Sequence, residues 1–227
     1  MKTHFDHLLE HVPDLASRAI LDIGSGRGGF IVDAAVRGAA VTGVEPYALY
    51  RAETNQRTEK RGVTVEVVSG TAEQLPFPDA SFGFINMSEV VEHVEDPRQA
   101  LIEAYRVLSP GGYGYISVPN RFGFFDPHYH LYGINWMPRS WAEWMLAVVG
   151  MTKQSTPETG RQRLSDMHYM TYGQASRLLT SAGFRVHDIR ELKLQKRLPL
   201  FVRLLALFVY RLGRACYFDT AHLLVHR

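Results

Sequence analysis

The chain has 227 residues, 46% hydrophobic and 21% charged, and this balance predicts one globular α/β domain with a large core rather than a disordered chain. A formal net charge of +2 is too small to indicate nucleic acid by itself, and no zinc-finger, RNA-recognition or helix-turn-helix signature accompanies it. The single cysteine, Cys216, excludes an intramolecular disulfide and a cysteine-based zinc cluster, and the polar start of the chain lacks the apolar core of a secretory signal, so we expect a cytoplasmic location.

A glycine turn between a strand and a helix is the first chemical motif. A short helix is expected within 3–16, and the apolar run at 19–23 predicts a buried parallel strand. Gly24, Ser25 and Gly26 follow at once, before the apolar spacing of a helix. Glycines adopt backbone angles closed to other residues and let a ligand approach the main chain closely. The free N–H groups at the start of the helix would then face that ligand.

The spacing of these glycines leaves two cofactor classes open. Gly24, Gly26 and Gly29 also satisfy the dinucleotide-binding pattern, and Glu45 lies about where that fold places its ribose-binding acid. Asp22 comes two residues before the first glycine, where its charge would repel a pyrophosphate but can organise a loop around an ammonium and a sulfonium. The residues therefore favour S-adenosylmethionine over NAD.

A second acid follows the second strand. Residues 40–44 predict that strand, and Glu45 comes directly after it. A carboxylate at this strand tip can accept both hydroxyl hydrogens of a ribose. Its place one strand-helix unit after the glycine turn supports that role.

The next elements continue the alternation of strands and helices. Branched residues alternate with polar ones at 63–68, which predicts the third strand, and 82–87 predicts the fourth. Met87 ends the fourth strand at the edge where open α/β sheets bind ligands, and we expect it to border an adenosine. A helix over 97–108 and a Pro-Gly-Gly turn then lead into an aromatic-rich strand at 113–118.

The order of these motifs over residues 19–120 resembles the class I S-adenosylmethionine-dependent methyltransferases. The glycine turn is similar to their motif I, and segment 69–88 closely resembles the branch that includes the ubiquinone and menaquinone biosynthesis methyltransferases. The resemblance implies a doubly wound, Rossmann-like sheet of seven strands, mostly parallel with an antiparallel last strand, and helices on both faces. It also implies S-adenosylmethionine as cofactor.

The same resemblance implies an adenine contact after the third strand. In that branch an acid-alanine pair borders the adenine edge. Here Thr71 occupies the usual place of the acid, and Ala72 and Glu73 follow. A threonine hydroxyl can accept a hydrogen from the exocyclic amine, but as a neutral and weaker partner.

A metal site is the alternative use of Glu89, Glu92 and His93. Some quinone O-methyltransferases of similar sequence use a divalent ion at such a motif, whereas other relatives have it without a metal. The sequence names no fourth ligand, so we do not adopt a metal site.

Segment 119–170, after the fifth strand, lies where relatives place acceptor recognition. All three tryptophans fall here within nine residues, which suits either a pocket for a flat or greasy acceptor or a lid that packs its aromatics on the core. His128 and His130 are two residues apart and would point the same way in an extended chain. Either could serve as general base to an acceptor hydroxyl.

The C-terminal part ends the sheet and adds one unusual helix. Strands are expected at 184–191 and, antiparallel, at 220–227. Between them, 198–214 predicts an amphipathic helix on which Arg203, Arg211 and Arg214 fall within a stripe of ~80°. A helix that covers the sheet with its arginines outward is the preferred interpretation. The alternative is a peripheral contact with anionic lipid.

We therefore predict a single methyltransferase domain over 1–227, with a substrate lid at 119–170. O-methylation of an aromatic or lipid-like small molecule is favoured, and N- or C-methylation of a small metabolite is the alternative. Two further hypotheses are a non-catalytic subunit that binds S-adenosylmethionine and a nicotinamide-dependent dehydrogenase. No nucleic-acid partner is expected, and the sequence predicts no oligomeric state.

Overall fold

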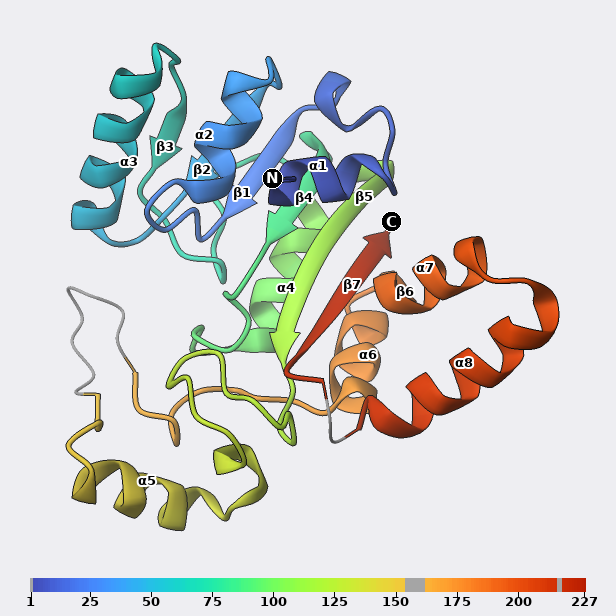
Figure 1. The fold of residues 1–227 in the computed structure, drawn as a ribbon. Helices are drawn as coiled ribbons and strands as arrows, with labels where there is room; N and C mark the ends of the chain where they lie inside the picture. Colours follow the sequence, from blue (N-terminus) through green and yellow to red (C-terminus); the bar gives the residue numbers. More distant parts are fainter. Residues whose placement is uncertain (1, 154–161, 216–217) are drawn as a thin grey trace.

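A seven-stranded sheet with helices on both faces forms the body of the protein (Figure 1). The computed structural model describes residues 2–153, 162–215 and 218–227, and Cys216 lies outside the described residues. The strand order is β3-β2-β1-β4-β5-β7-β6, and β7 runs antiparallel to both of its neighbours. The strands are β1 (Ile20–Ile23), β2 (Val41–Val44), β3 (Glu66–Val68), β4 (Phe82–Met87), β5 (Leu108–Pro119), β6 (Arg185–Asp188) and β7 (Thr220–His226). The fold class predicted from the sequence is confirmed.

Two helical layers cover the sheet, because alternate residues of each strand point to opposite faces. Helices α1, α2 and α7 pack on one face, and α4 and α6 pack on the other. The helices are α1 (His4–Leu9), α2 (Gly29–Val36), α3 (Ala48–Arg61), α4 (Pro97–Val107), α5 (Arg139–Val148), α6 (Tyr172–Ser181), α7 (Ile189–Arg197) and α8 (Leu200–Gly213), with short 3-10 turns at Leu15–Ser17 and Ile134–Trp136.

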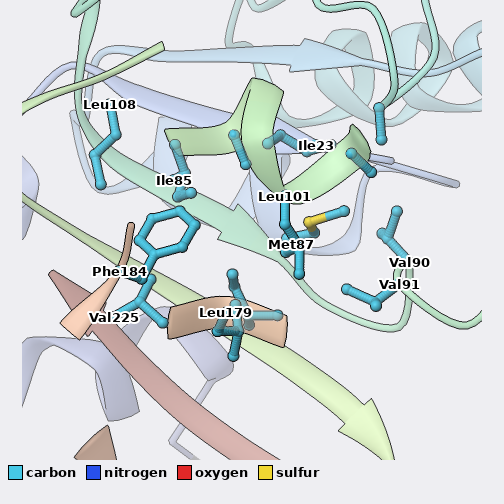
Figure 2. Close-up of a cluster of buried hydrophobic side chains, with 14 of the residues drawn as sticks. Ile23, Ile85, Met87, Val90, Val91, Leu101, Leu108, Leu179, Phe184 and Val225 are labelled. Atoms are coloured by element: carbon cyan, nitrogen blue, oxygen red, sulfur yellow. The ribbon is translucent and has the colours of Figure 1, made fainter. Parts of the chain in front are cut away.

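The larger core lies between the sheet and the α4 and α6 layer (Figure 2). Ile85 and Met87 of β4 are fully buried there, against Leu101 of α4 and Leu179 of α6. Phe184 is also buried in this cluster. Replacing one such residue by Ala typically lowers the free energy of unfolding by about 2–5 kcal/mol. The packing of this layer therefore fixes the strand ends that carry the site.

The sixth predicted strand is shorter than the sequence suggested. Residues 184–191 were expected to be extended, but β6 ends at Asp188 and Ile189 begins α7. The Asp188 carboxylate accepts hydrogen bonds from the backbone N–H groups of Arg190 and Glu191, so it caps the helix. The expected helix within 3–16 is likewise only α1 and a 3-10 turn.

Helices α7 and α8 form a hairpin inserted between β6 and β7 (Figure 1, orange to red). The preferred sequence interpretation of α8, a helix buried on the sheet with its arginines outward, is wrong. Arg211 and Arg214 turn toward α7 and pair with Glu191 at 2.8 and 2.7 Å. The apolar residues face outward instead, and eight large ones are exposed: Leu200, Phe201, Val202, Leu204, Leu205, Phe208, Val209 and Leu212. Among the helices that the structure describes, none has the length and apolar character needed to cross a membrane.

Candidate cofactor and acceptor site

Backbone strain and close packing explain two of the glycines after β1. Gly24 has a φ of +65°, and a Cβ there would lie 2.6 Å from Val90 Cγ2. Gly28, the residue before α2, has a φ of +80° and would meet Thr54 at 2.7 Å. Both positions therefore require glycine. Gly29, the third glycine of the sequence pattern, has open space around it.

Glu45 joins the glycine loop to the end of β2. Its Oε2 accepts a hydrogen bond from Gly26 N at 2.9 Å, and its Oε1 accepts one from Tyr47 N at 3.0 Å. Burial raises the pKa of Glu45, and these two backbone donors oppose the rise. Each carboxylate oxygen keeps a further acceptor position, so the side chain can still bind hydroxyl groups.

A cavity of about 540 Å³ opens beside this carboxylate. The predicted cofactor residues that line it are Gly24, Gly26, Glu45, Thr71, Ala72 and Glu73. Residues that sequence reasoning did not assign to the cofactor also line it, among them Tyr50, Val94 and Glu95. The cavity is large enough for a small-molecule cofactor and combines main-chain donors, an acid and apolar walls.

The other three predicted cofactor residues lie outside this lining. Asp22 is buried, and its Oδ1 accepts from Asn86 Nδ2 at 2.7 Å, while Asn86 Oδ1 lies 3.2 Å from His4 Nε2. Burial raises the pKa of Asp22 to about 7. Ser25 Oγ is buried toward Gly43, and the Met87 side chain is fully buried in the core. These three support the loop and the strand end from beneath, and their roles in cofactor binding stay predictions.

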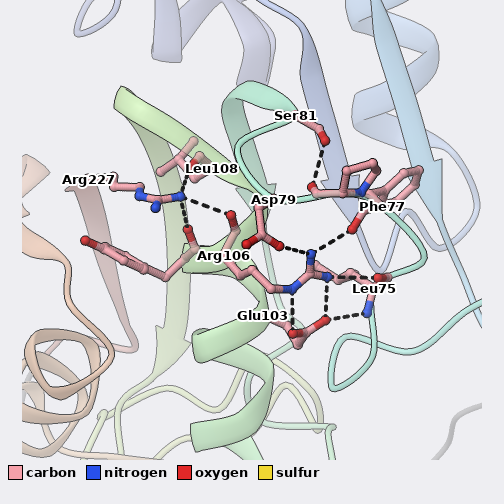
Figure 3. Close-up of polar contacts among 10 residues, drawn as sticks. Leu75, Phe77, Asp79, Ser81, Glu103, Arg106, Leu108 and Arg227 are labelled. Carbon is pink, nitrogen blue, oxygen red and sulfur yellow. Dashed lines mark hydrogen bonds and ion pairs between the residues drawn. The ribbon is translucent and has the colours of Figure 1, made fainter.

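An arginine of α4 holds the loop that carries the adenine candidates (Figure 3). Arg106 donates to the carbonyls of Leu75 and Phe77 at 3.0 and 2.7 Å. Glu103, which pairs with Arg106, accepts from Leu75 N at 2.9 Å. Further along, Glu73 accepts from the backbone N–H of Glu95 at 2.8 Å, so the loop is also tied to the segment after β4.

Four titratable side chains converge next to the cavity. His93 Nε2 lies 3.1 Å from His128 Nε2, and His128 Nδ1 lies 2.7 Å from the Tyr169 hydroxyl. Glu92 is fully buried, and neither carboxylate oxygen has a hydrogen-bond partner in the described part of the chain. Its Oε1 lies 3.7 Å from His128 Nε2. His93 also lines the cavity, so it joins this cluster to the predicted cofactor residues.

Burial controls the charge of this cluster. It lowers the pKa of His128 to about 4, with a further contribution from the neighbouring His93, and it raises the pKa of Glu92 to about 8. At neutral pH the histidine is neutral and the acid protonated.

The same atoms could instead hold a divalent cation. One ligand atom from each of Glu92, His93 and His128 lies within 4.8 Å of the others. A carboxylate and two imidazoles suit zinc or manganese, and a cation would resolve the unpartnered carboxylate. The sequence placed Glu89 in this motif, but Glu89 has a φ of +57° and lines the cavity instead. Only the fold brings His128 to this cluster.

His130 does not share the position of His128. Residues 126–130 form a turn in which Asp126 accepts from the backbone N–H of His128 and Tyr129, and His130 is exposed with a φ of +55°. The expectation that the two histidines point the same way is therefore wrong. The tryptophans do not pack on the core as one sequence interpretation expected, because all three are exposed: Trp136, Trp141 and Trp144. Their role in an acceptor pocket stays a prediction.

Comparison with known proteins shows what this chain is similar to. Residues 21–116 match the family described as methyltransferase domain. The chain resembles the class I S-adenosylmethionine-dependent methyltransferases. A ubiquinone biosynthesis O-methyltransferase of Pseudomonas putida is 36% identical over 115 residues, which are 47% of each chain. The chain thus spans about half the length of the curated relatives that it matches.

Solved structures agree with this family. A Thermotoga maritima S-adenosylmethionine-dependent methyltransferase, described as a possible histamine N-methyltransferase, is 26% identical with a TM-score of 0.52, over 82% of this chain and 75% of its own. An S-adenosylmethionine-dependent methyltransferase of Mesorhizobium loti shares the fold at 18% identity with a TM-score of 0.63, over 98% and 97% of the two chains. These matches confirm the recognition made from the sequence. Between the two cofactor classes that the glycine spacing left open, they support S-adenosylmethionine.

Proposed function

We propose that this protein is a methyltransferase that uses S-adenosylmethionine to methylate a hydroxyl group of an aromatic or lipid-like small molecule. One observation carries the proposal: His93 lines the cavity formed by the glycine loop and Glu45, and it also contacts His128 at 3.1 Å. A proton acceptor therefore lies beside the predicted cofactor cavity. That arrangement fits methyl transfer to a group that must lose a proton.

The residues present fit the cofactor. Glu45 offers two oxygens for ribose hydroxyls, Gly24 and Gly26 allow close approach of a ligand to the main chain, and Thr71 to Glu73 border the far side of the cavity. When bound, S-adenosylmethionine supplies a methyl group on a sulfonium, which is already a good leaving group. The protein then needs mainly to align the acceptor oxygen and to remove its proton.

We assign proton removal to His128 rather than to His130. Bound S-adenosylmethionine would supply the methyl group, and His128 would take the proton that the acceptor hydroxyl loses when its oxygen is methylated. The Tyr169 hydroxyl at 2.7 Å from Nδ1 orients the ring. A cation at Glu92, His93 and His128 is the competing role for the same side chain, and chelation separates the two.

The decisive experiment is methyl transfer from labelled cofactor. Purified protein is incubated with methyl-labelled S-adenosylmethionine and a panel of catechols, phenols and amines, and the products are identified by mass spectrometry. Label on an oxygen supports the proposal. Label on nitrogen or carbon replaces it with the alternative reactions, and cofactor binding without any transfer supports the non-catalytic subunit.

We further propose that α8 gives the protein a peripheral contact with membrane, compatible with a cytoplasmic location and a lipid-like acceptor. Phe201 is 84% exposed and Phe208 is 62% exposed on its outward face. Because Arg211 and Arg214 are paired with Glu191, the contact rests on apolar insertion rather than on attraction to anionic lipid. The lid at 119–170 adds exposed tryptophans, a residue type favoured at membrane interfaces.

A further inference from the structure

A second cavity lies on the opposite side of the sheet from α4 and α6. It has a volume of about 280 Å³ and lies between α1 and α7, with Tyr115 of β5 and His222 of β7 in its wall. Six basic or imidazole side chains line it: His4, His7, His11, Arg190, Lys193 and His222. No acidic residue lines it in the described part of the chain.

The acids nearest to this cavity already have partners. Glu10 pairs with Lys2 at 2.7 Å and approaches His7 at 3.9 Å. Asp219 lies 3.7 Å from Arg190, whose guanidinium also donates to a backbone carbonyl. Asp219 therefore neutralises the charge of Arg190 only in part. Lys193 contributes a second positive charge to the cavity wall.

His222 presents a donor in this cavity. Its Nδ1 lies 2.5 Å from the Tyr115 hydroxyl, and burial raises the pKa of that hydroxyl, which keeps its proton. If that hydroxyl donates to Nδ1, the neutral imidazole carries its hydrogen on Nε2 and can donate it to a ligand. Burial, together with the nearby Arg190 charge, lowers the pKa of His222 to about 4. Burial and the charge of Lys193 likewise lower the pKa of His11, as expected where cations gather without a counter-ion.

We propose that this cavity binds the carboxylate or phosphate group of a small anionic molecule. An anion here would be attracted by Lys193 and Arg190 and would accept a hydrogen bond from His222. The site goes beyond the proposed methyl transfer, because it lies on the α1 and α7 face and shares no lining residue with the cavity beside Glu45. His4 connects the two regions through its contact with Asn86, which in turn donates to Asp22.

The test is a titration of the full chain with inorganic phosphate and, separately, with benzoate, in the absence of S-adenosylmethionine. Calorimetry measures affinity, and the ring resonances of the histidines report where the ligand binds. We expect one saturable site for at least one probe, with shifts at His222. Lys193→Ala should weaken it by about tenfold or more, because it removes a charge-assisted hydrogen bond. His222→Gln should weaken it less, because the glutamine amide can still donate to the anion.

Lys60→Ala is the matched control. Lys60 carries the same charge but lines a neighbouring cavity against α2, which shares only His4 with the proposed site, so this variant should bind as the wild type does. Binding of only one probe tells a carboxylate ligand from a phosphate ligand. Equal weakening by Lys60→Ala, or no saturable binding of either probe, would overturn the proposal. If His222→Gln fails to fold, the comparison of the two lysine variants still decides.

Discussion

His93 and His128 face each other with their Nε2 atoms 3.1 Å apart, although 35 positions separate them in the chain. This contact joins the segment after β4 to the segment after β5. It brings a group that lines the cavity beside Glu45 into contact with one in segment 119–170, the predicted lid. The proposed chemistry depends on this contact, because His93 lines the cavity whereas His128 is the proposed proton acceptor.

Replacing His128 by Ala should lower turnover by ~10²–10⁴ and leave cofactor affinity unchanged, since the side chain takes the acceptor proton and does not line the cofactor cavity. Steady-state kinetics and calorimetry measure the two quantities. His130→Ala is the matched control, because His130 is exposed on the same turn and should retain turnover. Normal turnover in the His128 variant would remove the assignment, and a loss in the control would move it to His130.

Chelation distinguishes a base from a metal ligand. If His128 acts as the base, activity should persist in excess chelator and the melting temperature should not respond to Mn²⁺ or Zn²⁺. The reason is that the His128 imidazole then takes the proton of the acceptor hydroxyl without the help of a metal ion. Loss of activity in chelator, together with a melting temperature that rises on adding either ion, would instead assign Glu92, His93 and His128 as ligands.

Glu45→Gln should weaken binding of S-adenosylmethionine or its demethylated product at least tenfold. Charge-assisted hydrogen bonds contribute ~1.5–3 kcal/mol each, and an amide nitrogen cannot accept the backbone hydrogen that Glu45 now accepts. Calorimetry measures the dissociation constant. Glu53→Gln is the control, because Glu53 pairs with Arg27 at 3.0 Å and does not line the cavity. Equal dissociation constants for wild type and Glu45→Gln would show that the ribose is not held there.

Buried Asp22 should make folding stability depend on pH. Its folded pKa of about 7 exceeds the ordinary value of 3.8, so the folded state binds more protons than the unfolded state between these values. The contribution of Asp22 is therefore fully present below about pH 4 and is lost as pH rises through 7. The free energy of unfolding should fall across this window by roughly 2–4 kcal/mol more in wild type than in Asp22→Asn. Denaturant curves at several pH values measure it, and parallel pH profiles would contradict the assignment.

Vesicle co-sedimentation tests the outward face of α8. Wild-type protein should sediment with neutral phosphatidylcholine vesicles, and added salt should change this little, because Arg211 and Arg214 are already paired. Phe201→Ser and Phe208→Ser should each reduce binding, since each removes an exposed aromatic side chain. Leu49→Ser, at an exposed apolar position of α3, is the control. Binding that requires anionic lipid and disappears in salt would instead support the electrostatic contact that the sequence offered as the alternative.

Local patterns in the sequence were sufficient for the fold and for part of the cofactor cavity. The glycine loop, Glu45 and the segment 71–73 all follow strands directly. The carboxyl ends of parallel strands lie at the same edge of the sheet, so residues that follow these strands lie close together. Their positions in the chain therefore predict that they share one site. The six predicted residues that line the cavity share this property.

Only the tertiary structure decided which side chains face the cavity, which histidine joins Glu92, and which way α8 turns. Asp22 lies two positions before Gly24, which lines the cavity, yet its side chain is buried and bonded to Asn86 outside the cavity lining. A turn of irregular backbone separates His128 from His130, and no periodicity predicts its direction. The orientation of α8 depends on Glu191 of α7, which offers its arginines a partner on the protein side. An amphipathic pattern defines two faces of a helix, but a contact from elsewhere in the chain selects the face that is buried.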